Sequence, residues 1–463
     1  MVNWAADGMT RIVVCSGEPS GDAMVQELLP ALRALFGTGL QLRVLTSSPV
    51  DGLGEDEVLC PAPEPVLGFS MGGARRWRSV LENVWEILAP DPPDLFIAIS
   101  HHGFNLVLAA ELKALEGAPT KTLMVAPPEV WAWDVRLWLR AVGLVLRWVA
   151  AHRQSVPFVL GAMANRGRST LKVFDGIACL MEPNLKAYRR LDRKHEAGRL
   201  VVKVGHPFTR YADAAVQERV RDAARAMRAT LVSSPDDLLV GLFPGSREAE
   251  VDHLLPIMLD AVNRLRGRFG DRLKFVATAS DERRAAQIRR VLDDHSRRNS
   301  VASIPHVTSQ AEATLGAADF GLLCSGTVTL LAAILGLPSV VIYDRGWSLP
   351  RTLLTHLLLR RGRVSSERGA ELFGFALPSA IVGERVFPEL TMRQCTPQGV
   401  AASLEKMIGN EDARERIRMH QQRLLGLLQP SPPRAGYGTT ADTPMQRVAQ
   451  VGLQLVAGSA ERV

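Results

Sequence analysis

The residues PGSR at 244–247 combine a glycine, a hydroxyl group and an arginine at the end of an apolar run. A helical pattern follows from about residue 250, so this segment is expected to lead from a strand into a helix. Gly245 lets backbone amides approach a ligand, Ser246 adds a hydroxyl group, and Arg247 adds a donor that can grip a phosphate with two hydrogen bonds. The spacing predicts a diphosphate site. The alternative is an ordinary turn with a surface arginine.

A matching turn is predicted at Ser325, Gly326 and Thr327, which follow an apolar run at 320–324 and begin a helical pattern. Its hydroxyl groups and backbone amides again converge on one place. Parallel strands end at the same edge of a sheet, and open α/β sheets bind their ligands at that edge. The two turns together favour a nucleotide diphosphate as the ligand.

A third turn is predicted near the N-terminus, where SGEPSGD at 16–22 joins an apolar run to a helical pattern. The segment lacks the GxGxxG spacing, so a Rossmann dinucleotide site is only weakly indicated. Ser20 and Asp22 are residue types that cap the start of a helix. Glu18 is harder to explain as a cap, which leaves its carboxylate available for chemistry.

The three turns require strands and helices to position them, and the sequence supplies both in alternation. Short apolar runs separated by amphipathic stretches are typical of parallel α/β sheets, so we predict two doubly wound, Rossmann-like domains. The predicted parts are an N-terminal domain at 1–205, a C-terminal domain at 206–428, and a Pro/Gly-rich loop with a terminal helix at 429–463, which packs back on the N-terminal domain. That helix is expected to begin at Thr443-Pro444. The predicted strands are 11–15, 41–45, 95–100, 121–125, 176–180, 200–204, 238–243, 273–277, 320–324 and 339–343, and the main helices are 25–35, 106–115, 218–231, 250–266 and 329–335.

Composition narrows the class of protein. The chain has 463 residues, of which 47% are apolar and 22% charged, and this balance excludes a disordered or fibrous chain. A formal net charge of +7 favours a polyanionic partner, and leaves phosphate groups, nucleic acid and anionic lipid surfaces open. The five cysteines form no CxxC pair, so no disulfide framework or zinc site is expected and a reducing cytoplasm fits best. Charges interrupt the longest apolar stretch, at 130–149, which therefore does not read as a membrane-spanning helix.

Five motifs in one order carry a family resemblance. They are SGEPSGD at 16–22, PPEVWAW at 127–133, VGHP at 204–207, PGSR at 244–247 and SGT at 325–327. On these motifs the chain resembles the lipid-A-disaccharide synthase family from about Arg11 to Ala401. A UDP-sugar 2-epimerase has a related fold, but it would lack the first two motifs.

The resemblance implies a GT-B fold, in which two Rossmann-like domains face a cleft. It also implies transfer of an acylated glucosamine phosphate unit from UDP to a lipid-linked acceptor, by inversion, with no metal and no cofactor beside the UDP-sugar substrate. The N-terminal domain would take the acceptor and the C-terminal domain the UDP-sugar. The implied partners are a UDP-sugar donor, a lipid-linked acceptor and an anionic membrane surface, without nucleic acid, and the implied location is the cytoplasm or the inner face of the cytoplasmic membrane. Other residues expected to line the cleft are Ser16, Gly17, Ser20, Asn105, His206 and Tyr343.

The sequence departs from the family pattern at the expected catalytic residues. Where the family shows a pattern resembling IDAPDFN, this chain has ISHHGFN at 99–105, so Ser100 and Gly103 replace both aspartates. Leu331 stands where a glutamate suited to the nucleotide ribose is expected. The alternative function is therefore a family paralogue that binds a nucleotide or lipid without transferring a sugar.

Two histidines occupy the segment that has lost its aspartates. The imidazole of His101 or His102 can take a proton from an acceptor hydroxyl, because a histidine changes its charge near neutral pH. Together with Glu18 they are the candidate catalytic residues, and the alternative is that both histidines hydrogen-bond the loop. His206 is expected to be a hinge or cleft contact.

Aromatic and basic residues gather where the family receives its acceptor. Trp131 and Trp133 are expected in the core, whereas the run from Arg75 to Arg78, which includes Trp77, is expected at the surface. Tryptophan and arginine together suit the headgroup zone of a lipid bilayer. This run is the predicted contact with an anionic membrane. The sequence leaves the donor sugar and the oligomeric state open.

Overall fold

The fold is described from a computed structural model of the chain. Contacts along the chain divide it into two compact units, Met1–Pro207 with Leu428–Val463 and Phe208–Leu427. The sequence predicted that the C-terminal domain begins at residue 206 and ends at residue 428. The second unit begins at Phe208 and ends at Leu427, so the two boundaries differ from the predicted ones by two residues and one residue. The residues described are 9–47, 49–59, 71–115, 120–128, 166–192, 199–299, 306–343, 375–391, 394–410, 412–430 and 443–457.

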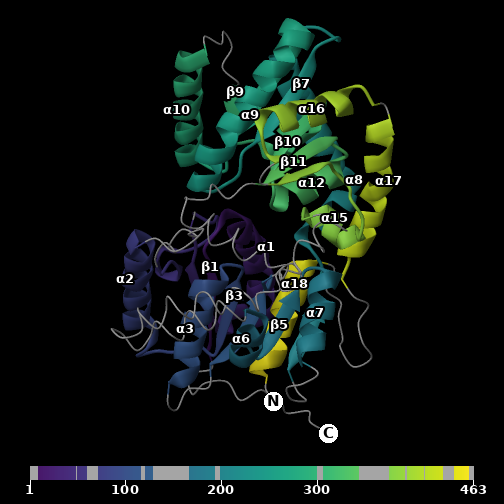
Figure 1. The fold of residues 1–463 in the computed structure, drawn as a ribbon. Helices are drawn as coiled ribbons and strands as arrows, with labels where there is room; N and C mark the ends of the chain where they lie inside the picture. The colour runs from purple at the N-terminus through teal and green to yellow at the C-terminus, as the bar shows by residue number, and fades with distance from the viewer. Residues whose placement is uncertain are drawn as a thin grey trace, which may run out of the picture. The chain divides into compact units, whose positions relative to one another are not determined.

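The first unit is built on a parallel six-stranded sheet with the strand order β2-β1-β3-β4-β5-β6 (Figure 1). Its central strand β3, LFIAI, is apolar and buried along its whole length, as a sheet covered on both faces requires. The register sets Val14 of β1 against Val44 of β2 on one side and Ile97 of β3 on the other. Its elements are β1 (Thr10–Ser16), α1 (Pro19–Phe36), η1 (Gly37–Gly39), β2 (Leu40–Leu45), η2 (Glu55–Glu57), α2 (Met71–Leu88), β3 (Leu95–Ile99), α3 (His102–Ala114), β4 (Lys121–Val125), α6 (Arg166–Val173), β5 (Gly176–Cys179), α7 (Glu182–Asp192), β6 (Leu200–Lys203) and α18 (Pro444–Val456).

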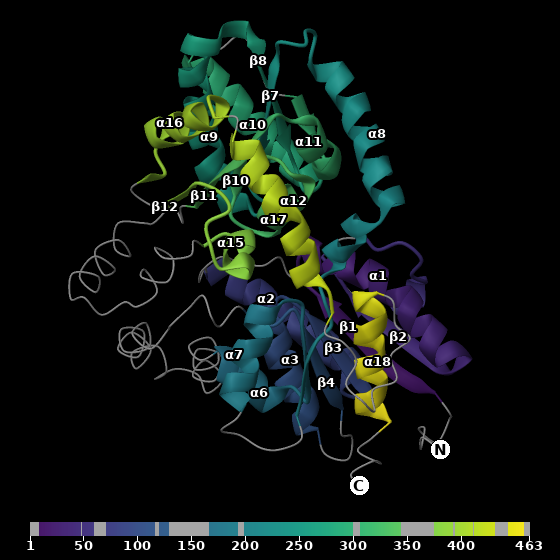
Figure 2. The ribbon, with the colours of Figure 1, turned by 90° about the vertical axis from the view of Figure 1, so that its right-hand side faces the viewer.

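The terminal helix α18 belongs to the first unit although it ends the chain. Thr443 caps it, accepting a hydrogen bond from the backbone N–H of Gln446 at 3.2 Å while its own N–H donates to the Gln446 side chain at 2.9 Å. The helix packs against α1 and against β3, β4 and β5, and Figure 2 shows it beside these strands. Its apolar residues Met445 and Val448 are fully buried there.

The second unit repeats the architecture with the strand order β12-β11-β10-β7-β8-β9, again all parallel (Figure 1). A core cluster of this unit joins residues of β7, β8 and β10 to the long helix α9. Its elements are η4 (Pro207–Ala212), α8 (Ala214–Leu231), β7 (Leu238–Phe243), α9 (Glu248–Phe269), η5 (Gly270–Arg272), β8 (Leu273–Thr278), α10 (Glu282–Asn299), β9 (His306–Thr308), α11 (Ala311–Ala317), β10 (Phe320–Cys324), α12 (Thr327–Leu335), β11 (Ser339–Tyr343), α15 (Leu377–Val382), β12 (Glu389–Thr391), α16 (Pro397–Ile408) and α17 (Asp412–Leu428).

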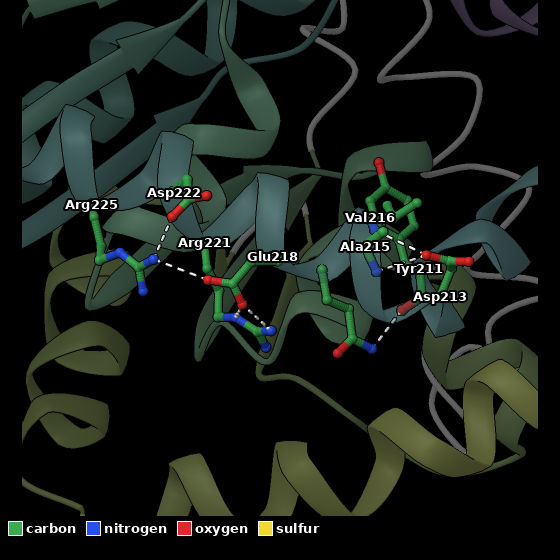
Figure 3. Close-up of polar contacts among 9 residues, drawn as sticks. Tyr211, Asp213, Ala215, Val216, Glu218, Arg221, Asp222 and Arg225 are labelled. Carbon is green, nitrogen blue, oxygen red and sulfur yellow. Dashed lines mark hydrogen bonds and ion pairs between the residues drawn. The ribbon is translucent and has the colours of Figure 1, made fainter.

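The first long helix of the second unit, α8, is fixed at its start by Asp213 (Figure 3). The Asp213 carboxylate accepts hydrogen bonds from the backbone N–H groups of Ala215 at 2.8 Å and Val216 at 3.1 Å. Such a cap is worth about 1 kcal/mol. Farther along, Glu218 pairs with Arg221 on the outer face. Solvent screens that pair, so the cap rather than the ion pair defines where the helix begins.

The buried carboxylate of Glu389 fixes the segment that leads into α15. Glu389 of β12 accepts hydrogen bonds from the backbone N–H groups of Phe375 and Ala376 and, at 2.5 Å, from the Ser379 hydroxyl. Ser379 in turn accepts a bond from the N–H of Val386 at 3.1 Å. One side chain therefore binds the two amides before α15 and the Ser379 hydroxyl in its first turn.

The doubly wound architecture predicted from the alternation of strands and helices is confirmed, and all ten predicted strands form. Two strands were missed, β9 and β12, each three residues long. Three residues are too short to show a period, and both strands lie at sheet edges. In the part of the chain that the structure describes, no helix is both long and apolar enough to cross a membrane.

The Glu389 contacts predict a large loss of stability on truncation. Glu389→Ala leaves three donors without their acceptor, two of them buried, and should lower the free energy of unfolding by about 2–4 kcal/mol. Urea unfolding followed by circular dichroism measures the change. Glu415→Ala, which removes an exposed carboxylate from α17, is the control and should change little. Equal effects of the two variants would contradict this role of Glu389.

Candidate functional site

In the first unit the strand order reverses between β1 and β3, and this reversal brings two loops together. The two strands pair in parallel with Ser16 opposite Ile99. The loop that leaves β1 at Gly17 and the loop that leaves β3 at Ser100 therefore start side by side. Ligands of open α/β sheets bind at such a reversal, beyond the carboxyl ends of the strands.

Gly17 and His101 touch across this pair of loops. A Cβ atom built on Gly17 would lie 1.9 Å from His101 Nδ1, so only a glycine lets the imidazole lie against the first turn. The His101 ring also stacks on the Phe104 ring, with centroids 5.8 Å apart and planes 4° from parallel. These contacts fix the imidazole at the carboxyl edge of the sheet, where the sequence predicted a candidate base.

The backbone at this edge is strained. Ser100, His101 and Ala126 have positive φ angles of 51°, 34° and 52°, a conformation that costs residues other than glycine about 1–3 kcal/mol each. Asn105 supports the first of them, since its buried amide donates to the Ser100 carbonyl at 3.1 Å. Strain of this kind is concentrated at functional sites, where it holds a side chain in one orientation.

The carboxylates of the first turn differ in their surroundings. Asp22 is buried and accepts a hydrogen bond from the Ser47 hydroxyl at 2.6 Å, so it joins α1 to the loop after β2. Glu18 precedes α1 at the N-cap position but makes no side-chain cap, and its carboxylate instead accepts a bond from the Ser20 hydroxyl at 3.2 Å. Of the two carboxylates, Glu18 is the partly exposed one, at the mouth of the turn.

The other two histidines have structural contacts. His102 Nε2 lies 2.9 Å from the hydroxyl of Thr170, a fully buried residue of α6, so this ring links α3 to α6. His206 is buried, and its backbone N–H donates to the Leu428 carbonyl at 3.0 Å. This bond joins the segment where the chain leaves the first unit to the segment where it re-enters that unit.

In the second unit the strand order reverses between β7 and β10, and here the two predicted anion turns meet. Phe243, the last residue of β7, pairs with Leu323 of β10. The turn at 244–247 and the turn at 325–327 consequently leave the sheet from adjacent strands. Beyond them, Tyr343 ends the next strand, with its ring centroid 5.7 Å from that of Phe375.

The 244–247 turn has the backbone geometry of a tight cradle. Gly245 has a φ angle of 112°, and a Cβ there would lie 2.5 Å from the Glu250 carboxylate. Glu250 is buried and accepts hydrogen bonds from the backbone N–H of Arg247 at 3.3 Å and from its guanidinium at 2.8 Å. A phosphate bound here would share Arg247 with Glu250.

The 325–327 turn is partly exposed and opens α12. The backbone N–H of Ser325 donates to the Ile342 carbonyl, and Thr329 satisfies the Gly326 carbonyl with its hydroxyl at 2.7 Å. Burial, with the Glu250 carboxylate adding to it, raises the pKa of the Cys324 thiol well above its usual range. The thiol thus stays protonated and is not a nucleophile. Leu331 is buried in α12.

Arg284 is a residue of this region that the sequence reasoning missed. It lies on α10, is 5% exposed, and donates from Nε to the Ser246 carbonyl at 3.2 Å. The signal was present in the sequence, because Arg284 lies four residues before Ile288 and so on the apolar face of its helix. An arginine on a buried helix face needs a partner, and here the partner is the turn itself.

Some predicted features lie outside the described residues. These are Trp131, Trp133 and Cys60, together with the side chains of Arg75, Arg76, Trp77 and Arg78 on α2. Within the described ranges no group of three His, Cys, Asp or Glu residues could hold a metal ion.

The contact between Gly17 and His101 can be tested by a double-mutant cycle. Gly17→Ala should lower the free energy of unfolding by about 1–3 kcal/mol, because the new methyl group overlaps the imidazole. His101→Ala in the same chain should recover most of that loss. Gly267→Ala, a position in α9 where a Cβ meets nothing within 4 Å, is the control and should stabilise the protein slightly. Urea unfolding provides all four values, and strictly additive losses would disprove the contact.

Comparison with solved structures identifies the fold. The glycotransferase of kitacinnamycin superposes with a TM-score of 0.54 at 14% identity, covering 97% of this chain and 99% of the other. The UDP-GlcNAc 2-epimerase from Neisseria meningitidis, bound to UDP-GlcNAc, superposes with a TM-score of 0.50 at 11% identity, over 88% and 94% of the two chains. At such identities the likeness concerns the fold alone, which is the two-domain α/β GT-B fold that the sequence predicted.

Comparison of sequences identifies the family. The lipid-A-disaccharide synthase of Azotobacter vinelandii is 29% identical over 86% of this chain and 89% of its own. That of Anaeromyxobacter dehalogenans is 27% identical over 88% and 90%. The family model for lipid-A-disaccharide synthetase matches residues 199–434, which is more than half of the chain and contains both turns of the second unit. The chain therefore belongs to the lipid-A-disaccharide synthase family of glycosyltransferases.

Proposed function

We propose that the protein transfers a sugar from a UDP donor to a lipid-linked, amphiphilic acceptor by an inverting displacement. The observation that carries this proposal is the adjacency of the 244–247 and 325–327 turns at the strand reversal of the second sheet. Two turns at helix N-termini, one with an arginine, suit a diphosphate better than any other ligand class. Family membership supports glycosyl transfer as the reaction.

On the donor side, the Arg247 guanidinium and the backbone amides of the two turns stabilise the departing UDP, apart from the amides of Arg247 and Ser325, which bond Glu250 and Ile342. Negative charge grows on the diphosphate as the glycosidic bond breaks, and fixed donors at that place stabilise the transition state more than the ground state. The N-terminus of α9, a helix of 22 residues, adds its dipole. The proposal includes no metal and no cofactor, and Ser325, Gly326, Thr327 and Tyr343 complete the donor site.

On the acceptor side, His101 is the base that removes the proton of the attacking hydroxyl. It occupies the segment in which Ser100 and Gly103 replace the expected aspartates, and stacking on Phe104 holds its ring in place. His102 is the weaker candidate because its Nε2 contacts Thr170. Glu18 lies in the neighbouring turn with Ser16, Gly17 and Ser20, and we assign it to binding of the acceptor.

The acceptor places the protein at a membrane surface. A lipid-linked sugar keeps its chains in the bilayer, so the enzyme has to approach the headgroups. A net charge of +7 and the basic run at 75–78 favour an anionic surface. The proposed location is the inner face of the cytoplasmic membrane, with the protein bound peripherally.

A second candidate function is a paralogue that binds the nucleotide or lipid and transfers nothing. The feature that favours it is the presence of Ser100 and Gly103 at positions where the family resemblance implies aspartates. A carboxylate lost from an acid–base step costs orders of magnitude in rate unless another group takes over. Turnover by the wild-type protein with a panel of UDP-sugars and membrane extract separates the two candidates.

The donor site predicts weaker nucleotide binding when Arg247 is truncated. Arg247→Ala should weaken UDP binding by about 1.5–3 kcal/mol, the scale of a charge-assisted hydrogen bond. Isothermal calorimetry measures the affinity. Arg221→Ala, on the exposed face of α8, is the matched control and should bind UDP like the wild type. If a folded Arg247→Ala variant keeps full affinity, Arg247 is not part of the site.

The acceptor site predicts loss of turnover without loss of nucleotide binding. His101→Ala should reduce turnover by about 10²–10⁴-fold and leave UDP affinity unchanged, whereas His102→Ala and Glu18→Gln should cost less. The wild-type rate should rise with pH as the imidazole loses its proton, and this dependence should vanish in His101→Ala. Product formation followed by mass spectrometry gives the rates. Full turnover in the double histidine variant would place the base elsewhere, and UDP binding without any turnover in the wild type would favour the paralogue.

A further inference from the structure

We propose that Arg284 is a positioning residue. It fixes the orientation of the 244–247 turn through the Ser246 carbonyl and so prepares the turn to bind a diphosphate. The inference rests on the proposed function for its ligand. The claim that Arg284 fixes the turn does not depend on the ligand, because it follows from contacts within the second unit. Arg284 acts through the turn and is not assigned any contact with the ligand.

The first contact reaches the turn directly. Arg284 lies near the start of α10 with 5% of its surface exposed, and its Nε donates to the Ser246 carbonyl at 3.2 Å. The backbone N–H of Arg284 itself donates to Asp281 at 2.8 Å, which fixes the first turn of α10. Arg284 is therefore held both at its backbone N–H and at its guanidinium group.

A second contact ties the same guanidinium to the start of α9. Its Nη1 donates to Gln287 Oε1 at 2.6 Å, and Gln287 Nε2 donates to the Glu248 carbonyl at 2.9 Å and to the Asp252 carboxylate at 2.6 Å. Gln287 is 3% exposed, and its bond to Arg284 is buried, whereas its bonds to Glu248 and Asp252 are partly buried. Arg284 and Gln287 together join α10 to the helix that the turn opens.

These contacts determine which way the peptide between Ser246 and Arg247 faces. In a trans peptide the carbonyl and the next N–H point in opposite directions. Arg284 holds the Ser246 carbonyl on one side, and Glu250 accepts from the Arg247 N–H on the other, at 3.3 Å. A peptide held from both sides cannot rotate, so the backbone of the turn keeps its conformation before any ligand arrives, although the Arg247 N–H itself is already bonded to Glu250.

The charge of Arg284 argues against a purely structural role. Burying a guanidinium costs free energy, and an apolar side chain of similar size often stabilises a core equally well or better. Its Nη1 lies 3.9 Å from the carboxylate of Glu248, which is mostly exposed. The bonds from the guanidinium to the Ser246 carbonyl and to Gln287 connect the buried cation directly to the turn and to its neighbouring helix.

The experiment compares Arg284→Met with Arg289→Met, an arginine on the exposed face of the same helix whose partner is Glu282. Calorimetry measures UDP affinity, and NMR titration measures uridine affinity. Arg284→Met should weaken UDP binding about tenfold and change uridine binding by less than about twofold, because only the phosphates meet the turn. Arg289→Met should match the wild type for both ligands. Equal losses for UDP and uridine would indicate general damage to the unit and overturn the proposal.

A second measurement needs no ligand. Hydrogen exchange of the backbone amides at residues 246–248 should accelerate in Arg284→Met and not in Arg289→Met. Arg284→Lys, which keeps the charge but cannot hold both Ser246 and Gln287, should also show faster exchange and serves if the methionine variant does not fold. Unchanged exchange in both variants would overturn the proposal even if UDP binds. If the wild-type protein does not bind UDP but exchange at residues 246–248 is faster in Arg284→Met, the proposed donor is wrong and the positioning role of Arg284 is retained.

Discussion

Each sheet of this protein reverses its strand order once, and the candidate site follows from that constraint. A strand can be followed by a helix on either face, so two neighbouring strands whose helices lie on opposite faces leave a gap at their carboxyl ends. In the first unit that gap lies beyond β1 and β3, and in the second beyond β7 and β10. The three turns that the sequence predicted as ligand sites, at 16–22, 244–247 and 325–327, each lie at one of these two places. The apolar strands are thus the means by which distant polar segments become neighbours.

Buried charged side chains then shape the loops that the strands bring together. Glu250 and Arg284 hold the 244–247 turn from opposite sides, and Glu389 binds the two backbone amides that precede α15. Burial makes these bonds strong and makes their loss costly, since an orphaned donor or charge finds no water. Loops that would sample many conformations in solution are in this way held in one. A site held in advance loses little entropy when its ligand binds.

The first unit uses strain for the same purpose. Ser100 and His101 adopt a left-handed backbone, with Asn105 bonded to the carbonyl between them, and His101 lies against a glycine that leaves it room. An imidazole pressed between Gly17 and Phe104 has little freedom. The loop therefore holds the His101 side chain in one orientation.

The sequence by itself determined the alternation of strands and helices, the doubly wound class and the family, because apolar periodicity and short motifs are local properties. It located the start of α18 from Thr443-Pro444 for the same reason, since a helix cap is made by neighbours in the chain. It could not detect β9 and β12, whose three residues form strands only because a long sheet edge offers them hydrogen bonds. Tertiary structure alone decided that Asp22 bonds Ser47, that His102 contacts Thr170 and that Arg284 lies beneath Ser246. Those contacts join residues 25 to 68 positions apart, and the identity of a distant partner is not encoded in the spacing of nearby residues.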